Sequence, residues 1–470
     1  MRSQRLQYLL QAAFAAGFAV IMLSGCQVET SHPASPLDAT LDIVVPPEDA
    51  STLDMSIDVR DSSREEMGDD RMESEPDQIS SDAVLDLSVP DRASGRVERF
   101  ESPVRRLSVD CCTACVVLSN GNVYCWGGCP GDEFNSDGVS IEERSLPRRM
   151  EGLREIEQFS HSCNIGCGVD RNHDVWCMGS NIYNLGTGSR ERYLPVAQRR
   201  LDVRGLTRVA VKTYAFLGVQ ADGSLFISNG GSFPPSRFTL SSAVTDIQIG
   251  SDYCVVLASG AVACRDGLSS PPRIVEGLDN VSGVAVGVAH KCAVKRDGTL
   301  WCWGNNDYSQ LGIPIESSEH CIREPYQGPI GLVYPANWCV RQPRQVPDLV
   351  DVVEVRAVGN NTCVLKRDGT IWCWGEVPTG LSATDTCPAA PWVPSGLTPS
   401  PASCVRHPGR VTGLPEVVSF DMGYAFTCAL QSSGQIWCWG DNSAGSLGVG
   451  YGLAPGGPVL VPASALPRDE

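Results

Sequence analysis

The chain has 470 residues, which leaves room for more than one ordinary domain, although a closed array of repeats uses the same length as a single unit. Its net charge is −18, since 55 Asp and Glu stand against 37 Lys and Arg, and no basic stripe interrupts this acidic balance. Such a charge distribution excludes the electrostatic footprint that nucleic-acid binding requires.

The N-terminus has the features of an export signal. Arg2 and Arg5 give it a positive start, and residues 9–23 form an apolar core of about 15 residues, too short to span a bilayer. Leu23-Ser24-Gly25-Cys26 follows directly and resembles the lipobox of bacterial lipoproteins. The resemblance implies a lipoprotein signal peptide over residues 1–25 and a lipidated Cys26, in the cell envelope and on the outer membrane of a Gram-negative bacterium. An ordinary signal peptide that ends near a cysteine is the alternative.

Residues 26–95 are expected to form a disordered acidic tether. Between residues 27 and 92 there are 18 Asp and Glu, four Arg and no Lys, with neither an aromatic residue nor a Cys. This segment cannot bury enough apolar surface to offset the entropy of ordering. No later segment is apolar for long enough to span a membrane, so the lipid is the only membrane contact we expect. The folded domain is then expected to span residues 96–470.

Seven copies of a strand–turn–strand unit occur in this domain, and most of them end in Cys-Trp-Gly. In chain order the copies are residues 115–127, 167–179, 217–227, 254–264, 292–304, 363–375 and 428–440. A three-residue loop such as Arg296-Asp297-Gly298 suits a type I turn followed by a glycine in the left-handed conformation.

Centring each hairpin on its turn places its two cysteines opposite each other, close enough for a bridge. The chain has 21 Cys, and removing Cys26 leaves an even number, which in an exported protein favours disulfides. The predicted hairpin pairs are Cys115–Cys125, Cys167–Cys177, Cys254–Cys264, Cys292–Cys302, Cys363–Cys373 and Cys428–Cys438. In the third copy Leu217 and Ile227 replace both cysteines together, as a structural bridge predicts. A zinc site needs shorter ligand spacings, so we expect neither a metal nor a cofactor.

Eight further cysteines lie outside the hairpins. Cys321 and Cys339 belong to an insertion at residues 313–342, and Cys387 and Cys404 to another at residues 376–407, so each pair is expected to close its own loop. The remaining four are Cys111, Cys112, Cys129 and Cys163. A bridge between Cys111 and Cys163 would join neighbouring repeats and leave Cys112 for Cys129, but four cysteines allow three connectivities and all remain open.

The repeat period predicts an all-β fold, a seven-bladed β-propeller. A proline-led segment and a further strand follow each hairpin, and the last such segment, residues 458–466, ends the array. We expect this C-terminal strand to complete the blade begun by residues 104–109 and so close the ring, which removes exposed sheet edges. The tryptophans beside Cys302, Cys373 and Cys438 should pack between neighbouring blades, on the face opposite the disulfides.

The repeat is similar to the regulator of chromosome condensation repeat. Residues 284–312 show the full pattern, which includes His290-Lys291-Cys292, Arg296-Asp297-Gly298, Trp301-Cys302-Trp303-Gly304 and Leu311-Gly312. The resemblance covers about residues 100–466 and implies a seven-bladed propeller. The founder of that family is a nuclear nucleotide-exchange factor, but an exported, oxidised chain is not expected to meet a GTPase partner.

No catalytic motif is evident, and an enzyme is not expected. Asp170-x-Asn172-x-Asp174 imitates the start of a calcium loop but lacks its later Gly and Glu, so a polar turn is the preferred interpretation. His290 is expected to be hydrogen-bonded at a strand end.

The two insertions are the better functional candidates, because binding residues often lie on loops of a rigid scaffold. Aromatic anchors are common hot spots, and the candidates are Tyr326, Tyr334, Trp338 and Trp392. The sequence therefore predicts a monomer that binds an unknown protein or glycan. The alternatives are a propeller enzyme, such as a lyase or hydrolase, a structural envelope lipoprotein, and insertions that only cap the propeller.

Overall fold

The structure is a computed structural model. It describes residues 102–128, 140–182, 185–212, 215–229, 235–265, 271–322, 326–328, 331–333, 336–376, 381–382, 385–387, 402–452 and 457–462. Cys26, the predicted signal peptide and the predicted tether lie outside the described residues. No helix in the described ranges is long and apolar enough to cross a membrane.

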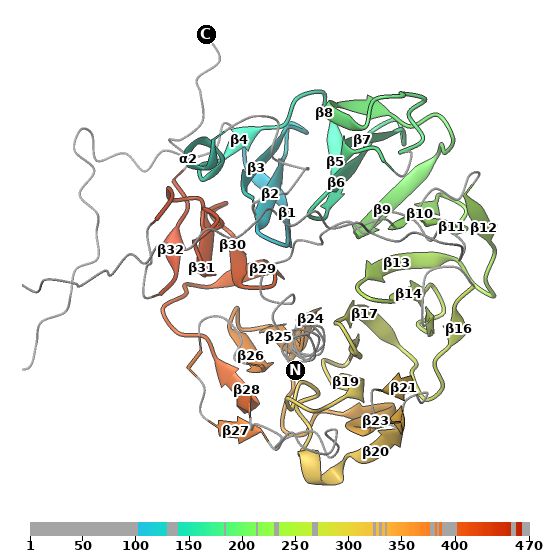
Figure 1. Cartoon of the computed structure of the whole chain (residues 1–470), viewed down its shortest axis with the longest axis vertical. Coiled ribbons are helices and arrows are strands. Elements are labelled where there is room, and N and C mark those ends of the chain that lie inside the picture. Colours follow the sequence, from blue (N-terminus) through green and yellow to red (C-terminus); the bar gives the residue numbers. More distant parts are fainter. Residues whose placement is uncertain are drawn as a thin grey trace, which may run out of the picture. The chain divides into compact units, whose positions relative to one another are not determined.

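Seven antiparallel sheets form a ring around a central channel, as the sequence predicts (Figure 1). We number these blades 1 to 7 in chain order. Blade 1 contains β1 (Val104–Asp110), β2 (Thr113–Leu118), β3 (Val123–Gly127) and β4 (Arg148–Arg149), with the short helix α2 (Ile141–Arg144) before β4. Blade 2 contains β5 (Ile156–His161), β6 (Ile165–Asp170), β7 (Val175–Ser180) and β8 (Tyr193–Arg199). Blade 3 contains β9 (Leu206–Lys212), β10 (Ala215–Gln220), β11 (Leu225–Asn229) and β12 (Ser236–Phe238).

The next two blades differ in size. Blade 4 contains β13 (Val244–Ile249), β14 (Tyr253–Leu257), β15 (Val262–Arg265) and β16 (Arg273–Ile274). Blade 5 has five strands, β17 (Val281–Val286), β18 (His290–Lys295), β19 (Leu300–Asn305), β20 (Glu319–Ile322) and β23 (Ala336–Gln345), with the 3-10 helix η2 (Ile315–Ser317) before β20. A separate hairpin of β21 (Tyr326–Gly328) and β22 (Gly331–Val333) lies between β20 and β23 in the chain.

The last two blades complete the ring. Blade 6 has five strands, β24 (Val352–Val358), β25 (Asn361–Lys366), β26 (Ile371–Gly375), β27 (Asp385–Cys387) and β28 (Ala402–Arg410). Blade 7 contains β29 (Val417–Met422), β30 (Phe426–Gln431), β31 (Ile436–Gly440) and β32 (Val459–Leu460). In every blade the first strand is innermost and lines the channel.

The predicted hairpin register is the one in the structure. Cys292 lies directly opposite Cys302, with the Cα atoms 4.1 Å apart, and the five other predicted hairpin pairs are bonded in the same way. Leu217 lies opposite Ile227 in blade 3. The turn glycine is left-handed, with a φ of 84° at Gly298, because the third residue of this loop turns the chain back on itself.

Each interface between blades is an apolar core, and the tryptophans and disulfides face opposite interfaces. Cys302 packs into the core between blades 5 and 6 together with Trp374, whereas Trp303 packs between blades 4 and 5. Trp374 is fully buried, and its indole Nε1 donates a hydrogen bond to the carbonyl oxygen of Gln310 in blade 5 at 3.0 Å. The predicted role of these tryptophans in packing is confirmed.

The ring does close, but the predicted strand exchange at the closure is wrong. β32 pairs with β31, and Val459 lies opposite Cys438, so the C-terminal strand completes blade 7. Blade 1 takes its fourth strand, β4, from the chain that follows its own hairpin. Blades 7 and 1 are held instead by a shared apolar core that includes Val461 and Trp126.

Candidate functional site

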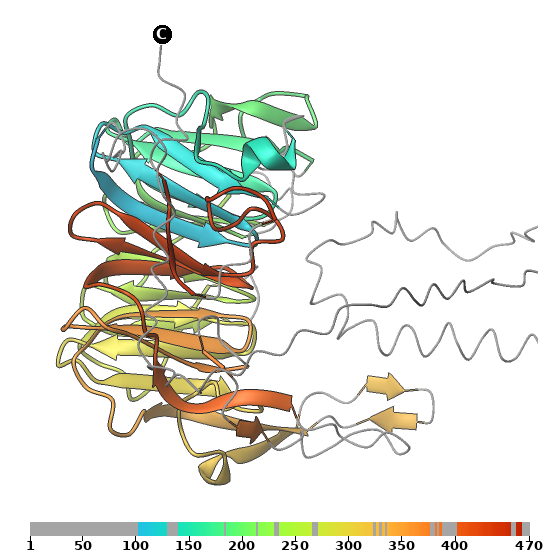
Figure 2. The same ribbon diagram turned by 90° about the vertical axis from the view of Figure 1, so that its left-hand side faces the viewer.

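Both predicted insertions leave the same face of the ring. The inner strand of a blade and its third strand run in the same direction, because each is antiparallel to the strand between them. The connection from β19 to β23 therefore leaves on the face where the inner strands end, and so does the connection from β26 to β28. We call this the insertion face. Figure 2 shows the β21–β22 hairpin projecting beyond the ring on this side.

The two insertions are closed by disulfides in equivalent positions. Cys321 lies opposite Asn337 and is bonded to Cys339, two residues further along β23. Cys387 lies opposite Ala402 and is bonded to Cys404, again two residues further along its partner strand. Each insertion thus begins as a short two-stranded extension of its blade, with its base covalently fixed.

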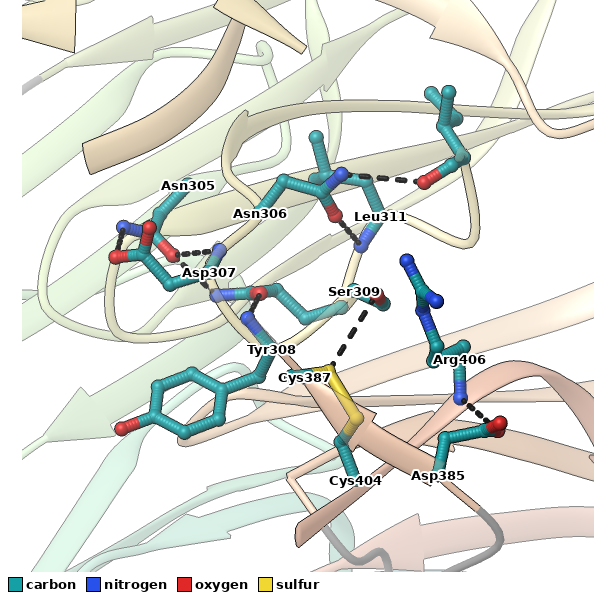
Figure 3. Close-up of a disulfide and its surroundings, with 12 residues drawn as sticks. Asn305, Asn306, Asp307, Tyr308, Ser309, Leu311, Asp385, Cys387, Cys404 and Arg406 are labelled. Atoms are coloured by element: carbon teal, nitrogen blue, oxygen red, sulfur yellow. Dashed lines mark hydrogen bonds between the residues drawn. A yellow bond between two sulfur atoms is a disulfide. The ribbon is translucent and has the colours of Figure 1, made fainter. Parts of the chain in front are cut away.

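A polar contact joins the two insertions, and one of its partners, Arg406, is labelled in Figure 3. The guanidinium of Arg406 on β28 donates to Glu316 Oε1 in η2 at 2.9 Å. The backbone amide of Glu316 and this hydrogen bond from Arg406 together lower the pKa of the Glu316 carboxyl. Ser309 Oγ lies 3.6 Å from Cys387 Sγ, so the disulfide of the second insertion also contacts the loop that precedes the first insertion. The insertions of blades 5 and 6 are therefore one connected surface.

The turn beneath the first insertion is organised by amide side chains, also drawn in Figure 3. Asn306 is fully buried, its Oδ1 accepts from the backbone amide of Leu311 at 3.1 Å, and its Nδ2 donates to the carbonyl oxygen of Ile313 at 3.2 Å. Asn442 holds Leu447 in the same way in blade 7. The first insertion therefore starts from a turn that other blades also build.

The four predicted aromatic residues are only partly described. Trp338 is partly buried on β23, and its ring meets that of His320 edge-on at 4.2 Å between centroids. Its backbone amide donates to Asp307 Oδ1 at 2.8 Å, which ties the strand to the turn beneath it. Tyr326 lies on β21 with only its backbone described, and Tyr334 and Trp392 lie outside the described residues.

The remaining predicted site features are structural. Asp170 Oδ1 accepts the backbone amides of Asn172 and Asp174, both at 2.9 Å, so the calcium-like sequence is a polar turn. His290 is buried and its Nε2 lies 2.8 Å from Thr362 Oγ1, as predicted for a hydrogen-bonded strand end. Among the described residues, no three His, Cys, Asp or Glu side chains gather to hold a metal ion.

The unassigned cysteines follow one of the open connectivities. Cys111 is bonded to Cys163, with the Cα atoms 5.5 Å apart, and this bridge joins blades 1 and 2. Cys112 is also disulfide-bonded. Cys129, its predicted partner, lies outside the described residues.

The channel is a second polar site, with a volume of about 470 Å³. In its middle the side chains mostly satisfy one another. Gln158 of blade 2 bonds both the amide and the carbonyl of Val209 in blade 3, at 2.7 and 2.8 Å. Arg356 pairs with Glu354 and, at 2.9 Å, with Asp421. Burial raises the pKa of Glu354 and outweighs the opposing effect of Arg356. The bonds of Gln158 with Val209 and of Arg356 with Asp421 link neighbouring blades, so this part of the channel is a structural seam.

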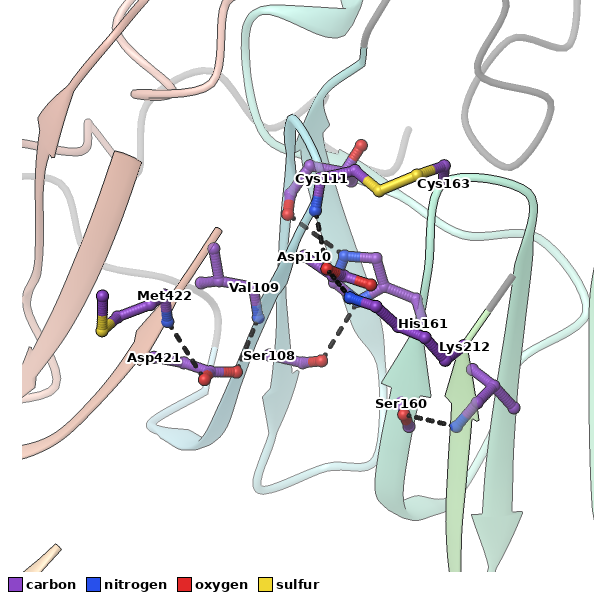
Figure 4. A network of polar contacts seen from close by, with 12 residues as sticks. Ser108, Val109, Asp110, Cys111, Ser160, His161, Cys163, Lys212, Asp421 and Met422 are labelled. Atoms are coloured by element: carbon purple, nitrogen blue, oxygen red, sulfur yellow. Dashed lines mark hydrogen bonds and ion pairs between the residues drawn. A yellow bond between two sulfur atoms is a disulfide. The ribbon is translucent and has the colours of Figure 1, made fainter. Parts of the chain in front are cut away.

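A different network lies where the channel opens on the insertion face (Figure 4). Lys212 of blade 3 reaches across blade 2 to Asp110 of blade 1, with 2.5 Å between Nζ and Oδ1. Burial alone would lower the pKa of Lys212, but Asp110, Tyr424 and Asp421 together more than offset this effect and raise the pKa.

His161 is buried beside this ion pair. Its Nε2 lies 3.1 Å from the carbonyl oxygen of Thr113 and its Nδ1 3.1 Å from Ser108 Oγ. Since a carbonyl only accepts, Nε2 carries the proton and Nδ1 accepts from the Ser108 hydroxyl. Burial lowers the pKa of His161, so the ring is neutral and both its nitrogens are occupied. It is not available as a general base in this arrangement.

Comparison with known proteins identifies the repeat. Residues 281–310 and 417–446 match one model of the regulator of chromosome condensation (RCC1) repeat, and residues 297–365 match a second. These matched segments lie in blades 5, 6 and 7. The fold of the chain is similar to that of yeast RCC1 (Prp20) in a crystal structure with Kap60, with a TM-score of 0.57 and 16% identity over 79% of this chain and 90% of that one. Human WBSCR16 gives a TM-score of 0.54 at 19% identity, over 73% and 94% of the two chains.

Other proteins with similar sequences are larger than the matched region. Protein pim1 of Schizosaccharomyces pombe is 24% identical over 60% of this chain and 48% of its own length. The mitochondrial RCC1 domain-containing protein RUG3 of Arabidopsis thaliana is 28% identical over 38% of this chain and 46% of its own. The human E3 ubiquitin-protein ligase HERC2 is 26% identical over 49% of this chain, but over 5% of its own length. The chain thus spans about half the length of the first two relatives and a small part of the third.

Comparing the seven repeats with one another reveals a residue that sequence reasoning missed. The register of each inner strand against its hairpin aligns the seven strands. At the position of His161 the six other repeats have apolar residues, namely Val109, Val211, Ile249, Val286, Ala357 and Met422. A polar residue at an apolar position of a repeat was the available signal, but it can be read only after the inner strands are aligned.

Proposed function

We propose that this chain is a lipid-anchored, extracytoplasmic RCC1-repeat propeller that binds a protein or glycan partner through its two paired insertions, without catalysing a reaction. The observation that carries the proposal is the contact between Arg406 and Glu316, which makes one surface from the insertions of adjacent blades. Each insertion is also closed at its base by a disulfide. A surface held in advance loses less entropy when a partner binds.

Related propellers support an interaction role. Yeast RCC1 (Prp20) is bound to Kap60 in its crystal structure, and Prp20p is described with binding properties to Gsp1p and histones. HERC2 is a ubiquitin ligase, but the similarity covers only 5% of it. The occupied ring nitrogens of His161 argue against general base catalysis at the channel mouth.

A capture experiment with the full-length chain tests the insertion surface. In the test variant, residues 323–335 and 388–401 are each replaced by Asn-Gly, which keeps both disulfides and closes the short strands with a two-residue hairpin. A purified partner, identified by crosslinking to the intact chain, should lose binding to this variant. Equal binding to both chains would contradict the proposal.

The matched control changes the opposite face of the ring. The turns at Gly298 and Gly369 join the second and third strands of blades 5 and 6, so they lie on the side away from the insertions. Replacing the exposed Arg296 and Arg367 in these turns with Ser should leave binding unchanged. Loss of binding by this control variant would place the interface on the face opposite the insertions and contradict the proposal.

The lipid anchor needs its own test. Intact mass measurement of the mature chain should show a diacylglyceryl addition on Cys26, and a Cys26→Ser variant should appear in the soluble periplasmic fraction. An unmodified Cys26 in a membrane-free protein would overturn the anchor without affecting the binding proposal.

A further inference from the structure

The insertion face also contains one mouth of the channel. The polar residues around this mouth are distributed unevenly among the seven blades. One position beyond His161, blades 1, 2 and 3 have Asp110, Ser162 and Lys212. Three of the other four blades have glycine at this position, and blade 6 has Val358. We call Asp110, Ser162 and Lys212 the polar arc.

The glycines show why blades 4, 5 and 7 have no side chain at this position. A Cβ atom on Gly250 would lie 2.5 Å from the carbonyl oxygen of Val286, and one on Gly423 would lie 2.8 Å from that of Cys111. Neighbouring inner strands approach too closely there for any side chain. The polar arc departs from this repeated arrangement. Blades 4, 5 and 7 pack against their neighbours without a polar side chain at this position, so the ring does not need one in order to close.

The polar arc is also incompletely hydrogen-bonded, unlike the middle of the channel. Within the part of the chain that the structure describes, Asp110 Oδ2 and Ser162 Oγ have no hydrogen-bond partner, and both residues are buried, at 6% and 1% exposed. A buried polar atom without a partner costs about 1–3 kcal/mol, so such atoms usually mark a missing ligand or water.

The Lys212 side chain lies between Asp110 and the open channel, and it can move to let a ligand reach Asp110. Its side chain is 21% exposed to the channel, while that of Asp110 beneath it is 8% exposed. The lysine ammonium has three donors and a flexible stem, and only Asp110 Oδ1 takes one of them within the described residues. Turning this ammonium towards an incoming group would uncover Asp110 Oδ2.

The chemistry of the site selects the class of ligand. Asp110 and Lys212 together are neutral, so a charged ligand would leave an unbalanced charge in a partly buried site. The ligand must supply donors for Asp110 and an acceptor for Lys212, which neighbouring hydroxyl groups do. Tyr424 lines the channel with these two residues, is 47% exposed and presents an aromatic ring. We propose that Asp110, Lys212 and Tyr424 bind a neutral sugar unit.

This site is separate from the paired insertions, so the two proposals can fail independently. The probes are glucose, galactose, mannose and N-acetylglucosamine, measured by saturation-transfer difference NMR and titration with the full-length, oxidised chain. Glucosamine and glucuronic acid serve as positively and negatively charged comparators. At least one neutral sugar should bind, and the charged comparators should bind more weakly.

Two variants assign the binding to the proposed residues. Lys212→Met and Tyr424→Ala should each weaken the dissociation constant by about tenfold, the loss expected for a hydrogen bond to a charged group or for an aromatic contact. Tyr424→Ala carries the test if Lys212→Met fails to fold, because Tyr424 is exposed. The matched control is Lys291→Met, since Lys291 pairs with Asp252 at 2.7 Å outside the channel. Binding of no neutral sugar, or equal binding by wild type and Tyr424→Ala, would overturn the proposal.

Discussion

The carboxylate of Asp421 in blade 7 accepts a hydrogen bond from the backbone amide of Val109 in blade 1, at 2.8 Å across the seam of the ring. The same carboxylate pairs with Arg356 of blade 6 at 2.9 Å. One side chain therefore connects three consecutive blades, including the two that no strand exchange joins.

Asp421→Ala should weaken the closure of the ring. The change leaves Arg356 and the Val109 amide without their shared partner, at an expected cost of about 2–4 kcal/mol. The midpoint of urea unfolding measures this loss. Asp222→Ala is the control, because its ion pair with Arg237 is exposed to solvent and should leave the unfolding midpoint nearly unchanged. Equal midpoints for the two variants would show that Asp421 does not hold the seam.

Cys292 and Cys302 should be replaceable by the pair that blade 3 uses. A bridge closing this loop contributes at most about 2.7 kcal/mol through the unfolded chain. Cys292→Leu with Cys302→Ile loses this term but keeps an apolar pair, as Leu217 and Ile227 do. The double Ser variant also buries two hydroxyls in a core where both cysteines are fully buried, and should be less stable by a further 1–3 kcal/mol or so. A double Ser variant as stable as the Leu and Ile variant would contradict this account.

His290 should make the fold sensitive to acid. Burial, and then the neighbouring Lys291, lower the pKa of His290 from 6.5 to about 3. The unfolded chain therefore binds this proton at higher pH than the folded chain, so stability falls as the pH drops from 6.5 towards 3, by about 1.4 kcal/mol per pH unit. His290→Gln should reduce the loss between pH 6.5 and 5 by about 2 kcal/mol in urea unfolding. The exposed His407→Gln is the control, and an unchanged pH profile in His290→Gln would be evidence against a buried neutral ring.

Glu316 and Arg406 should matter for order rather than for overall stability. The Glu316 side chain is 70% exposed, so breaking the pair should change the unfolding free energy by under about 1 kcal/mol. Arg406→Glu places two like charges together and should speed amide hydrogen exchange in β20 and β27, as measured by mass spectrometry. The charge-swapped double variant, Glu316→Arg with Arg406→Glu, should restore slow exchange. Fast exchange in the swapped variant would mean that the pair does not join the insertions.

The hairpins could be predicted from sequence because their constraints are local. Gly298 marks the turn, and the spacing of Cys292 and Cys302 then sets the register without knowledge of any other blade. The pairing of Cys111 with Cys163 is different, since it depends on how blade 1 meets blade 2, and spacing alone allowed three connectivities.

The closure was predicted wrongly for a physical reason. The segment that contains β32 can satisfy the backbone of either blade 7 or blade 1, and the pairing involves only two residues. Applying one rule to every repeat, that a proline-led strand completes the blade of the hairpin before it, gives the observed order. The channel network was missed because Asp110 and Lys212 are 102 residues apart and meet only when the ring forms.

The bridge between Cys111 and Cys163 gives the chain an unequal response to mechanical tension. If the molecule is pulled by its ends, the 52-residue separation between these cysteines cannot be extended while the bond is intact. The bridge therefore prevents the extension of roughly 170–190 Å of contour length. The closed segment includes most of blade 1 and the first strand of blade 2. A hairpin bridge such as Cys428–Cys438 withholds a separation of only 10 residues in blade 7. An oxidised chain stretched in an optical trap should therefore lengthen mainly from its C-terminal blades, and a reductant should release the length stored at the N-terminal side.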